Sequence, residues 1–319
     1  MRMWQGAVGN SKYNGIVSPA YTILTPTPEA NGKFFMELFK KKSTLQIFQR
    51  WSQGLTSDTW NLKYPILSSI QFAIPSVEEQ EKIAEYFSSL DHLITLHQRK
   101  CDDTKELKKY MLQKMFPKNG EKFPEIRFKG FTEAWEQRKL GDLLNETREK
   151  TSVEDEDTLL SCAIDGMFLN SELFSHFRGS SNIGYLKVKK NDLILSAQNL
   201  HLGNCNVNLR FEHGIISPAY KVYELINCDP LFMQAWVKQD KTKDFFLKAS
   251  TEGASICRKN IVWEELYKQE LPVPKINEQV KIGAFFQNLD NLITLHQRKC
   301  DTLKELKKYM LQNMFPKKG

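Results

Sequence analysis

The chain has 319 residues, enough for about two domains with buried cores that need neither a metal nor a disulfide to fold. Hydrophobic residues make up 41% of the chain and charged residues 26%, a composition that is typical of a soluble globular protein and excludes long-range disorder. The formal net charge of +7 favours a polyanionic partner without requiring one.

The sequence also lacks features of membrane or secreted proteins. No stretch approaches the roughly 18 uninterrupted apolar residues of a membrane span. The N-terminus lacks the apolar segment and cleavage site of a secretion signal. No Cys-x-x-Cys pair occurs among the six cysteines, and reduced packing thiols are their simplest interpretation. We therefore expect a cytoplasmic protein without a membrane partner.

An internal repeat with an offset of 199 residues is the most informative feature. Residues 91–118 match residues 290–317 at 24 of 28 positions. The same offset aligns Ser-Pro-Ala-Tyr at 18–21 with the same four residues at 217–220. A single register kept over so long a span indicates two copies of one structural unit.

Residues 1–75 are the first predicted element and correspond to only part of the second copy. At the repeat offset Met1 corresponds to Leu200, so the first copy has no counterpart of residues 132–199 in this sequence. We expect residues 1–75 to be a truncated domain that cannot bury its core alone. Either another chain supplies the missing strands, or this part does not act in recognition.

Residues 76–117 are expected to form one long helix. No Gly or Pro occurs from Val77 to Phe116, and apolar residues recur at alternating spacings of four and three, as in a heptad seam. Ser76 and Glu79 match a capping box, and Pro117 ends the helix. About forty helical residues would extend about 60 Å.

A linker punctuated by Gly and Pro follows at 118–131, and it leads into a complete domain at 132–274. Short alternating apolar runs bounded by Gly, Asn, Asp and Pro predict strands in this domain. Short helices are expected near residues 229–248 and 261–267. The domain should therefore be β-rich with a few helices.

Residues 275–316 repeat the heptad seam of the first long helix. Two long helices with matching seams in one chain are expected to pack antiparallel, as a rigid spacer between two globular parts. The predicted fold class is therefore α+β, with β-rich domains separated by two coiled-coil-like helices.

Catalytic motifs are absent or incomplete, which favours a binding protein over an enzyme. Residues 179–184 have the glycine spacing of a phosphate loop but lack the Lys and Ser/Thr that should follow. Residues 229–232 lack the second proline of the amino-methyltransferase signature. The spacings of a mixed His and Cys set match no common zinc pattern, so no metal site is expected; the set is His201, Cys205, His213 and Cys228.

Together these features resemble the specificity subunit of type I restriction-modification enzymes. The resemblance covers nearly the whole chain. It is carried by Phe123–Phe131, Trp135–Gly141, Ile216–Tyr220, Leu271–Pro274 with Glu278 and Gln279, and Leu289–Ile293.

The resemblance implies two target-recognition domains separated by two conserved antiparallel helices. Each domain would read one half of a bipartite site in double-stranded DNA, and the helix length would set the gap between the halves. Two modification subunits would dock on the helices, and restriction subunits would join to cut. S-adenosylmethionine, ATP and magnesium would belong to those partners, so no cofactor is expected in this chain.

Candidate contact residues fall into two sets. Base reading needs Arg, Lys, Asn or Gln at base edges, with basic side chains on phosphates. The DNA-binding candidates are Arg178, Lys187, Lys189, Lys190, Gln198, Asn199, His201, Asn204, Arg210, Arg258 and Lys259. The candidates for binding partner subunits on the helices are Arg99, Lys100, Leu107, Tyr110, Leu112, Arg298, Lys299, Leu306, Tyr309 and Leu311.

Two functional interpretations remain open at this point. In the first, the chain is a working DNA-specificity subunit that directs adenine methylation and restriction by its partners, with self-association restoring a second domain. In the second, it is an assembly-only or inactive truncated scaffold, the product of a recombination reservoir, which binds modification subunits without reading a target.

Overall fold

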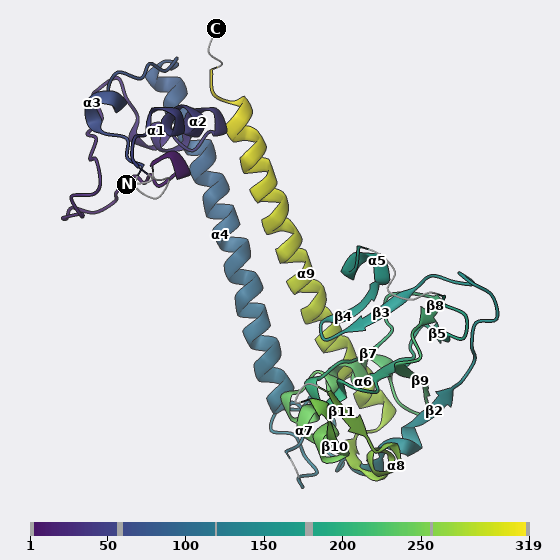
Figure 1. Ribbon diagram of the computed structural model, residues 1–319. Coiled ribbons are helices and arrows are strands. Elements are labelled where there is room, and N and C mark those ends of the chain that lie inside the picture. Colours follow the sequence, from purple (N-terminus) through teal and green to yellow (C-terminus); the bar gives the residue numbers. More distant parts are fainter. Residues whose placement is uncertain (1–2, 56–59, 119, 176–180, 256–257, 317–319) are drawn as a thin grey trace. The chain divides into compact units, whose positions relative to one another are not determined.

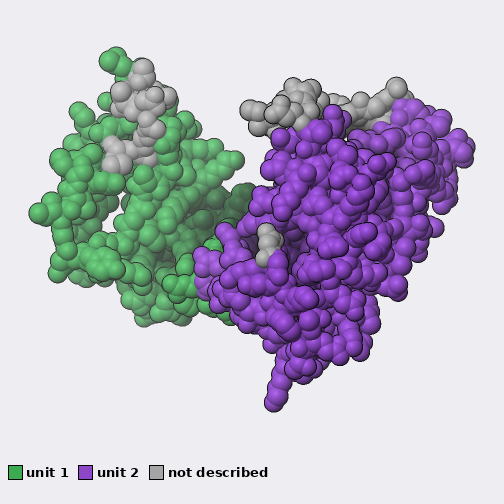
Figure 2. All heavy atoms as spheres, turned by 90° about the horizontal axis from the view of Figure 1, so that it is seen from below, with its two compact units in different colours: residues 1–102, 294–319 green, residues 103–293 purple. Residues whose placement is uncertain are grey.

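The computed structural model describes residues 3–55, 60–118, 120–175, 181–255 and 258–316. The chain forms two compact units, coloured separately in Figure 2. Unit 1 contains residues 1–102 and 294–319, and unit 2 contains residues 103–293. Because this division falls inside the two long helices, the segment boundaries predicted at 75, 117, 131 and 274 remain predictions.

The two long helices are present as expected (Figure 1). Helix α4 spans Val77–Lys114 and helix α9 spans Ile276–Asn313, so each has 38 residues and their bounds differ by the repeat offset at both ends. The repeat inferred from sequence is therefore a structural repeat. Within the described ranges, no helix combines the length and apolar character needed to cross a bilayer.

In unit 1 the segments of α4 and α9 run antiparallel. The Lys307 ammonium lies 2.7 Å from the Asp91 carboxylate, and further along, the Nδ1 atoms of His97 and His296 lie 3.1 Å apart. In unit 2 the equivalent lysine, Lys108, lies 2.6 Å from Asp290. The antiparallel packing predicted from the seams is thus confirmed within each unit.

In the described part of residues 1–76, three α-helices precede α4 and build a core against it. They are α1 (Gly32–Leu38), α2 (Lys42–Trp51) and α3 (Tyr64–Leu67), after a short 3₁₀ helix η1 (Met3–Gln5). The Asn31 side chain caps α1 by accepting hydrogen bonds from the backbone N–H groups of Lys33 and Phe34. Phe34 and Phe48 are fully buried and share a cluster with Phe315.

Residues 1–75 bury their aromatic side chains together with residues of the long helices. The core of α1 to α3 includes Ile83 and Phe87 of α4 and Phe315 after α9. The expectation that residues 1–75 are a truncated domain remains a prediction. In the described part of residues 1–75 the only β-type pairing is an isolated bridge between Gln53 and Asn61. The predicted strands are therefore a property of the second repeat.

Unit 2 holds a four-stranded antiparallel sheet in the order β2-β9-β6-β7. Strand β8 pairs separately with β5. The strands named so far are β2 (Leu144–Thr147), β5 (Leu186–Lys189), β6 (Leu193–Ser196), β7 (Cys205–Val207), β8 (His213–Ile216) and β9 (Tyr220–Leu225). The remaining elements of unit 2 are β1 (Glu136–Lys139), η2 (Leu140–Leu143), β3 (Leu160–Ala163), β4 (Gly166–Leu169), α5 (Asn170–Leu173), η3 (Leu200–Leu202), α6 (Pro230–Val237), α7 (Asp240–Lys248), β10 (Ser250–Ser255), β11 (Arg258–Ile261), α8 (Trp263–Lys268) and β12 (Glu270–Val273). The β-rich character predicted for residues 132–274 is confirmed.

A buried glutamine near the start of each long helix joins that helix to the chain before it. The Gln80 side chain accepts a hydrogen bond from the Asn31 N–H and donates one to the Pro75 carbonyl. Gln279 accepts from the Asp229 N–H and donates to the Pro274 carbonyl, at 2.8 Å in both cases. Because an unpaired buried amide is costly, these bonds fix the same joint in both repeats.

Candidate nucleic-acid interface and helix surfaces

Several of the predicted DNA-binding cations in unit 2 are already paired with carboxylates. On β5, the Lys187 ammonium lies 3.0 Å from Glu149 and 2.6 Å from Glu156. The hydrogen bond from Lys187 lowers the pKa of Glu156 to about 2. After the strand, Lys190 lies 2.5 Å from Glu212. These lysines therefore offer less net charge to a phosphate than the sequence suggested.

Arg210 is also paired with a carboxylate, whereas among the described residues Lys189 is not. The Arg210 guanidinium donates two hydrogen bonds to the Glu172 carboxylate, which raise the pKa of Arg210. Lys189 is exposed, and in the described part of the chain its ammonium has no ion pair. Lys189 is therefore the cation of this group best placed to meet a phosphate.

A second group of candidates meets at residues 196–204, here called the polar loop. The Ser196 hydroxyl accepts hydrogen bonds from the N–H groups of Gln198 and Asn199. The Lys259 N–H, from the β10–β11 hairpin, donates to the Gln198 carbonyl at 3.2 Å. The fold therefore brings together Gln198, Asn199 and Lys259, although Lys259 is some sixty residues away in sequence.

The polar loop and the start of α7 also bury polar atoms that have no partner among the described residues. These are both ring nitrogens of His201, both amide atoms of Gln239 and Oδ1 of Asn204. His201 is only 8% exposed and Gln239 only 4%. Buried polar groups are normally paired, so unpaired ones mark a place where water or a ligand can bind.

The DNA-binding candidates lie on several elements of unit 2. Lys187 and Lys189 belong to β5 and Lys190 follows it, whereas the polar loop comes after β6. Arg178 lies outside the described residues, as does the side chain of Arg258. His201 is buried, whereas a base contact needs an accessible side chain.

Sequence reasoning missed Gln239 and Lys221. Gln239 precedes α7, and nothing in its local sequence indicates burial. The Lys221 ammonium lies 2.9 Å from Glu146 and 4.5 Å from the ring centre of Trp263. Lys221 lies on β9 and its aromatic partner on α8, so only the tertiary fold reveals this cation–π contact.

The predicted partner-binding residues of the helices fall in both units. In unit 1, Leu306 is 38% and Tyr309 64% exposed, whereas Leu311 packs partly against the core. Arg99, Lys100, Arg298 and Lys299 are exposed there. In unit 2, their repeat equivalents Leu107 and Tyr110 are 46% and 50% exposed.

Leu112 is an exception among the helix candidates. It is 8% exposed and belongs to the main core of unit 2. The expectation of an exposed contact at this position is wrong, because residues after α4 fold back and pack Met115 and Phe116 into the same core.

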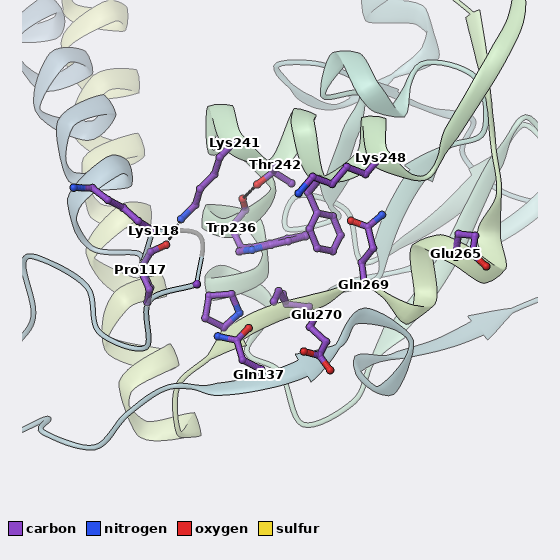
Figure 3. A pocket seen from close by; sticks show the side chains of 14 residues that line it. Pro117, Lys118, Gln137, Trp236, Lys241, Thr242, Lys248, Glu265, Gln269 and Glu270 are labelled. Atoms are coloured by element: carbon purple, nitrogen blue, oxygen red, sulfur yellow. Dashed lines mark hydrogen bonds between the residues drawn. The ribbon is translucent and has the colours of Figure 1, made fainter.

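A pocket of about 430 Å³ lies in unit 2 beside α7 (Figure 3). The Lys241 ammonium points to the Pro117 carbonyl and donates to it at 2.5 Å, and burial lowers the pKa of Lys241 to about 8. Glu265 and Glu270 also line the pocket. Lys118 and Lys248 line it as well, and the bond from Lys241 ties α7 to the chain that follows α4.

The structure assembles no recognisable reaction centre in the described residues. No group of three or more His, Cys, Asp or Glu side chains there could hold a metal ion. His213 pairs with Asp157, and Cys205 is fully buried. Burial raises the pKa of Cys162 to about 11 and of Cys205 to about 12, which keeps both thiols protonated and unreactive.

Comparison with known proteins identifies a family. The family described as "Type I restriction modification DNA specificity domain" matches residues 3–106 and 132–305, and so covers both repeats. The chain is 23% identical over 265 residues to the type I restriction enzyme MjaVIII specificity subunit of Methanocaldococcus jannaschii, covering 77% of this chain and 61% of that protein.

Two further relatives agree. The putative type I restriction enzyme MjaX specificity subunit of the same organism is 21% identical over 298 residues, covering 87% of this chain and 65% of that protein. The chain therefore spans less than two thirds of either curated relative. The type I restriction-modification S subunit from M. genitalium matches in structure with a TM-score of 0.56 at 16% identity, covering 91% of this chain and 74% of that one.

Proposed function

The chain belongs to the type I restriction-modification specificity family, and we propose that it binds double-stranded DNA at a specific sequence on behalf of partner subunits. The match of the family to both repeats carries this proposal. In it, modification subunits methylate adenine and restriction subunits cut, so catalysis, S-adenosylmethionine, ATP and magnesium belong to those partners.

Unit 2 contains the better candidate for a DNA-reading surface. Residues 132–274 carry 17 basic and 21 acidic residues, so their formal net charge is −4 and binding must rely on local groups. The polar loop supplies amide side chains that suit base edges, namely Gln198 and Asn199. Lys189 and Lys259 supply charge for phosphates, which position a protein on the duplex.

The exposed apolar side chains on the long helices support docking of modification subunits. Leu306 and Tyr309 in unit 1 and their repeat equivalents in unit 2 stand on helix surfaces outside the cores. Equivalent residues in a repeat suit two copies of one partner. Leu306→Ala with Tyr309→Ala should therefore weaken binding of a modification subunit without lowering the stability of unit 1.

A second candidate function is assembly without target reading. It is favoured by the pairing of Lys187, Lys190 and Arg210 with carboxylates, which reduces the positive charge that residues 132–274 can offer to DNA. In this case the helices would hold modification subunits and no DNA motif would be methylated.

Co-expression with the cognate modification subunit separates the two functions. Methylated adenines are mapped across the host genome with the intact chain, and with the Leu306→Ala, Tyr309→Ala variant as the docking control. A methylated motif that appears only with the intact chain supports DNA reading. A stable complex that leaves the genome unmethylated supports assembly alone.

A further inference from the structure

Residues 13–24 of unit 1 correspond to two buried strands of unit 2. At the repeat offset, Gly-Ile-Val-Ser-Pro-Ala-Tyr at 15–21 aligns with Gly-Ile-Ile-Ser-Pro-Ala-Tyr at 214–220. In unit 2 these residues build the end of β8, a turn and the start of β9. The two segments therefore provide an internal comparison of nearly the same sequence in two surroundings.

The turn has the same geometry in both repeats. The Tyr21 N–H donates to the Ser18 carbonyl at 3.0 Å, and the Tyr220 N–H donates to the Ser217 carbonyl at 3.1 Å. In each copy the serine hydroxyl also accepts from the alanine N–H two residues later, at 3.3 Å. The turn that joins the two strands is therefore formed in unit 1 as well.

The arms on either side of the turn differ sharply between the repeats. Ile16 is 101% and Ile23 is 70% exposed, whereas their equivalents Ile215 and Val222 are 0% exposed. Among the described residues, no backbone hydrogen bond joins 14–17 or 22–25 to another segment. The first copy thus presents extended, apolar arms with unpaired backbone groups.

In unit 2 the equivalents of these arms are strands β8 and β9, and their partner strands come from one stretch of the chain. Strand β8 pairs with β5, and β9 pairs with β2 on one side and β6 on the other. All three partner strands lie between residues 144 and 196. The strands that pair with β8 and β9 therefore belong to the segment 132–199, which the first repeat does not match within this sequence.

We propose that residues 13–24 are a docking surface for a polypeptide segment of the same kind as residues 132–199. The segment would add strands equivalent to β2, β5 and β6, whose alternating apolar residues would cover Ile16 and Ile23. Strand addition fits this surface because unpaired backbone groups bind an extended segment and alternate side chains select it. The inference does not depend on DNA reading.

A second copy of the 319 residues cannot supply enough segments to cover every acceptor region. Each copy holds one segment 132–199 and two acceptor regions, at 13–24 and 212–223. A copy that gave its segment away would uncover its own β8 and β9. The occupant must therefore be a further segment of this kind, from outside these 319 residues.

A fusion tests the proposal on the full chain. A copy of residues 132–199 is placed directly before Met1, which reproduces the junction between Asn199 and Leu200. Hydrogen exchange is then followed by mass spectrometry. We expect the amides of 14–17 and 22–25 to exchange at least about tenfold more slowly than in the unfused chain. The same exchange rate in both proteins would overturn the proposal.

Two controls separate strand docking from other causes of protection. Val188→Asp with Ile194→Asp in the added copy alone should remove the protection, while residues 213–225 stay protected in every protein. Ile23→Asp should lower protection in the fusion but leave exchange in the rest of the unfused chain unchanged. Protection of 14–17 that rises with the concentration of the unfused chain would instead assign the surface to a second copy and overturn the proposal.

Discussion

Matched substitutions of two equivalent isoleucines give the sharpest test of the contrast between the repeats. Ile215 is fully buried in β8, where it faces Lys187 of β5 in the ladder and bridges to Leu159. Ile16 is its repeat equivalent and is fully exposed. Replacing each residue by alanine removes the same atoms from opposite environments.

The expected magnitudes differ by several kcal/mol. Truncation of a buried isoleucine to alanine costs about 2–5 kcal/mol, because apolar contacts are lost and a cavity is left. A cost of about 3 kcal/mol raises the unfolded fraction of unit 2 roughly a hundredfold. At an exposed position the change should stay within about 0.5 kcal/mol.

Urea unfolding followed by hydrogen-exchange mass spectrometry measures the two units separately. We expect Ile215→Ala to shift the unfolding midpoint of peptides from unit 2 to lower urea, and Ile16→Ala to leave the midpoint of unit 1 unchanged. Equal destabilisation by the two variants would refute the reasoning, since it would mean that Ile16 is buried in solution.

Three further predictions concern ionic groups. Arg127→Ala breaks a bidentate pair with Glu278, whose side chain is 2% exposed, and should destabilise unit 2 by about 3–5 kcal/mol in thermal melts. Partial burial and the facing histidine lower the pKa of His97 below its ordinary 6.5, so the unfolded chain takes up a proton first and unit 1 should lose stability as the pH falls below about 6.5. Lys189→Glu should weaken DNA binding and its salt dependence more than Lys190→Glu, because Glu212 already neutralises Lys190.

Each of these predictions has a matched control. Arg148→Ala removes an arginine that is 81% exposed and should change stability by no more than about 1 kcal/mol. His97→Gln should flatten the pH dependence of unit 1, and a slope that persists in this variant would assign it to other groups. Equal effects of the two lysine reversals in a salt titration would contradict the role of the ion pair.

The helical part of the fold was predictable because its signals are local. Heptad spacing and the closing prolines predicted both long helices, and the structure has them with bounds that match the repeat. The antiparallel packing followed from the matching seams. The hydrogen bonds of Gln80 and Gln279 at the helix starts were harder to predict. Only Gln279 belonged to a motif that carried the family resemblance.

The candidate site was harder to predict because its determinants are long-range. Strand β2 pairs with β9 across almost eighty residues, and no periodicity in one sequence specifies that pairing. The carboxylates that pair with Lys187 and Arg210 come from the chain between β2 and β3 and from α5, so these cations looked free in sequence. The exposure of Ile16 was likewise hidden, because its pattern is that of the buried Ile215.

Exchange of the recognition domain tests the central claim most directly. Residues 132–274 are replaced by the corresponding segment of a relative that directs methylation to a different motif, and methylated adenines are mapped after co-expression with the cognate modification subunit. If unit 2 reads DNA, the methylated motif should take on the half-site of the donor. A motif that stays unchanged after the exchange would contradict the assignment of DNA reading to these residues.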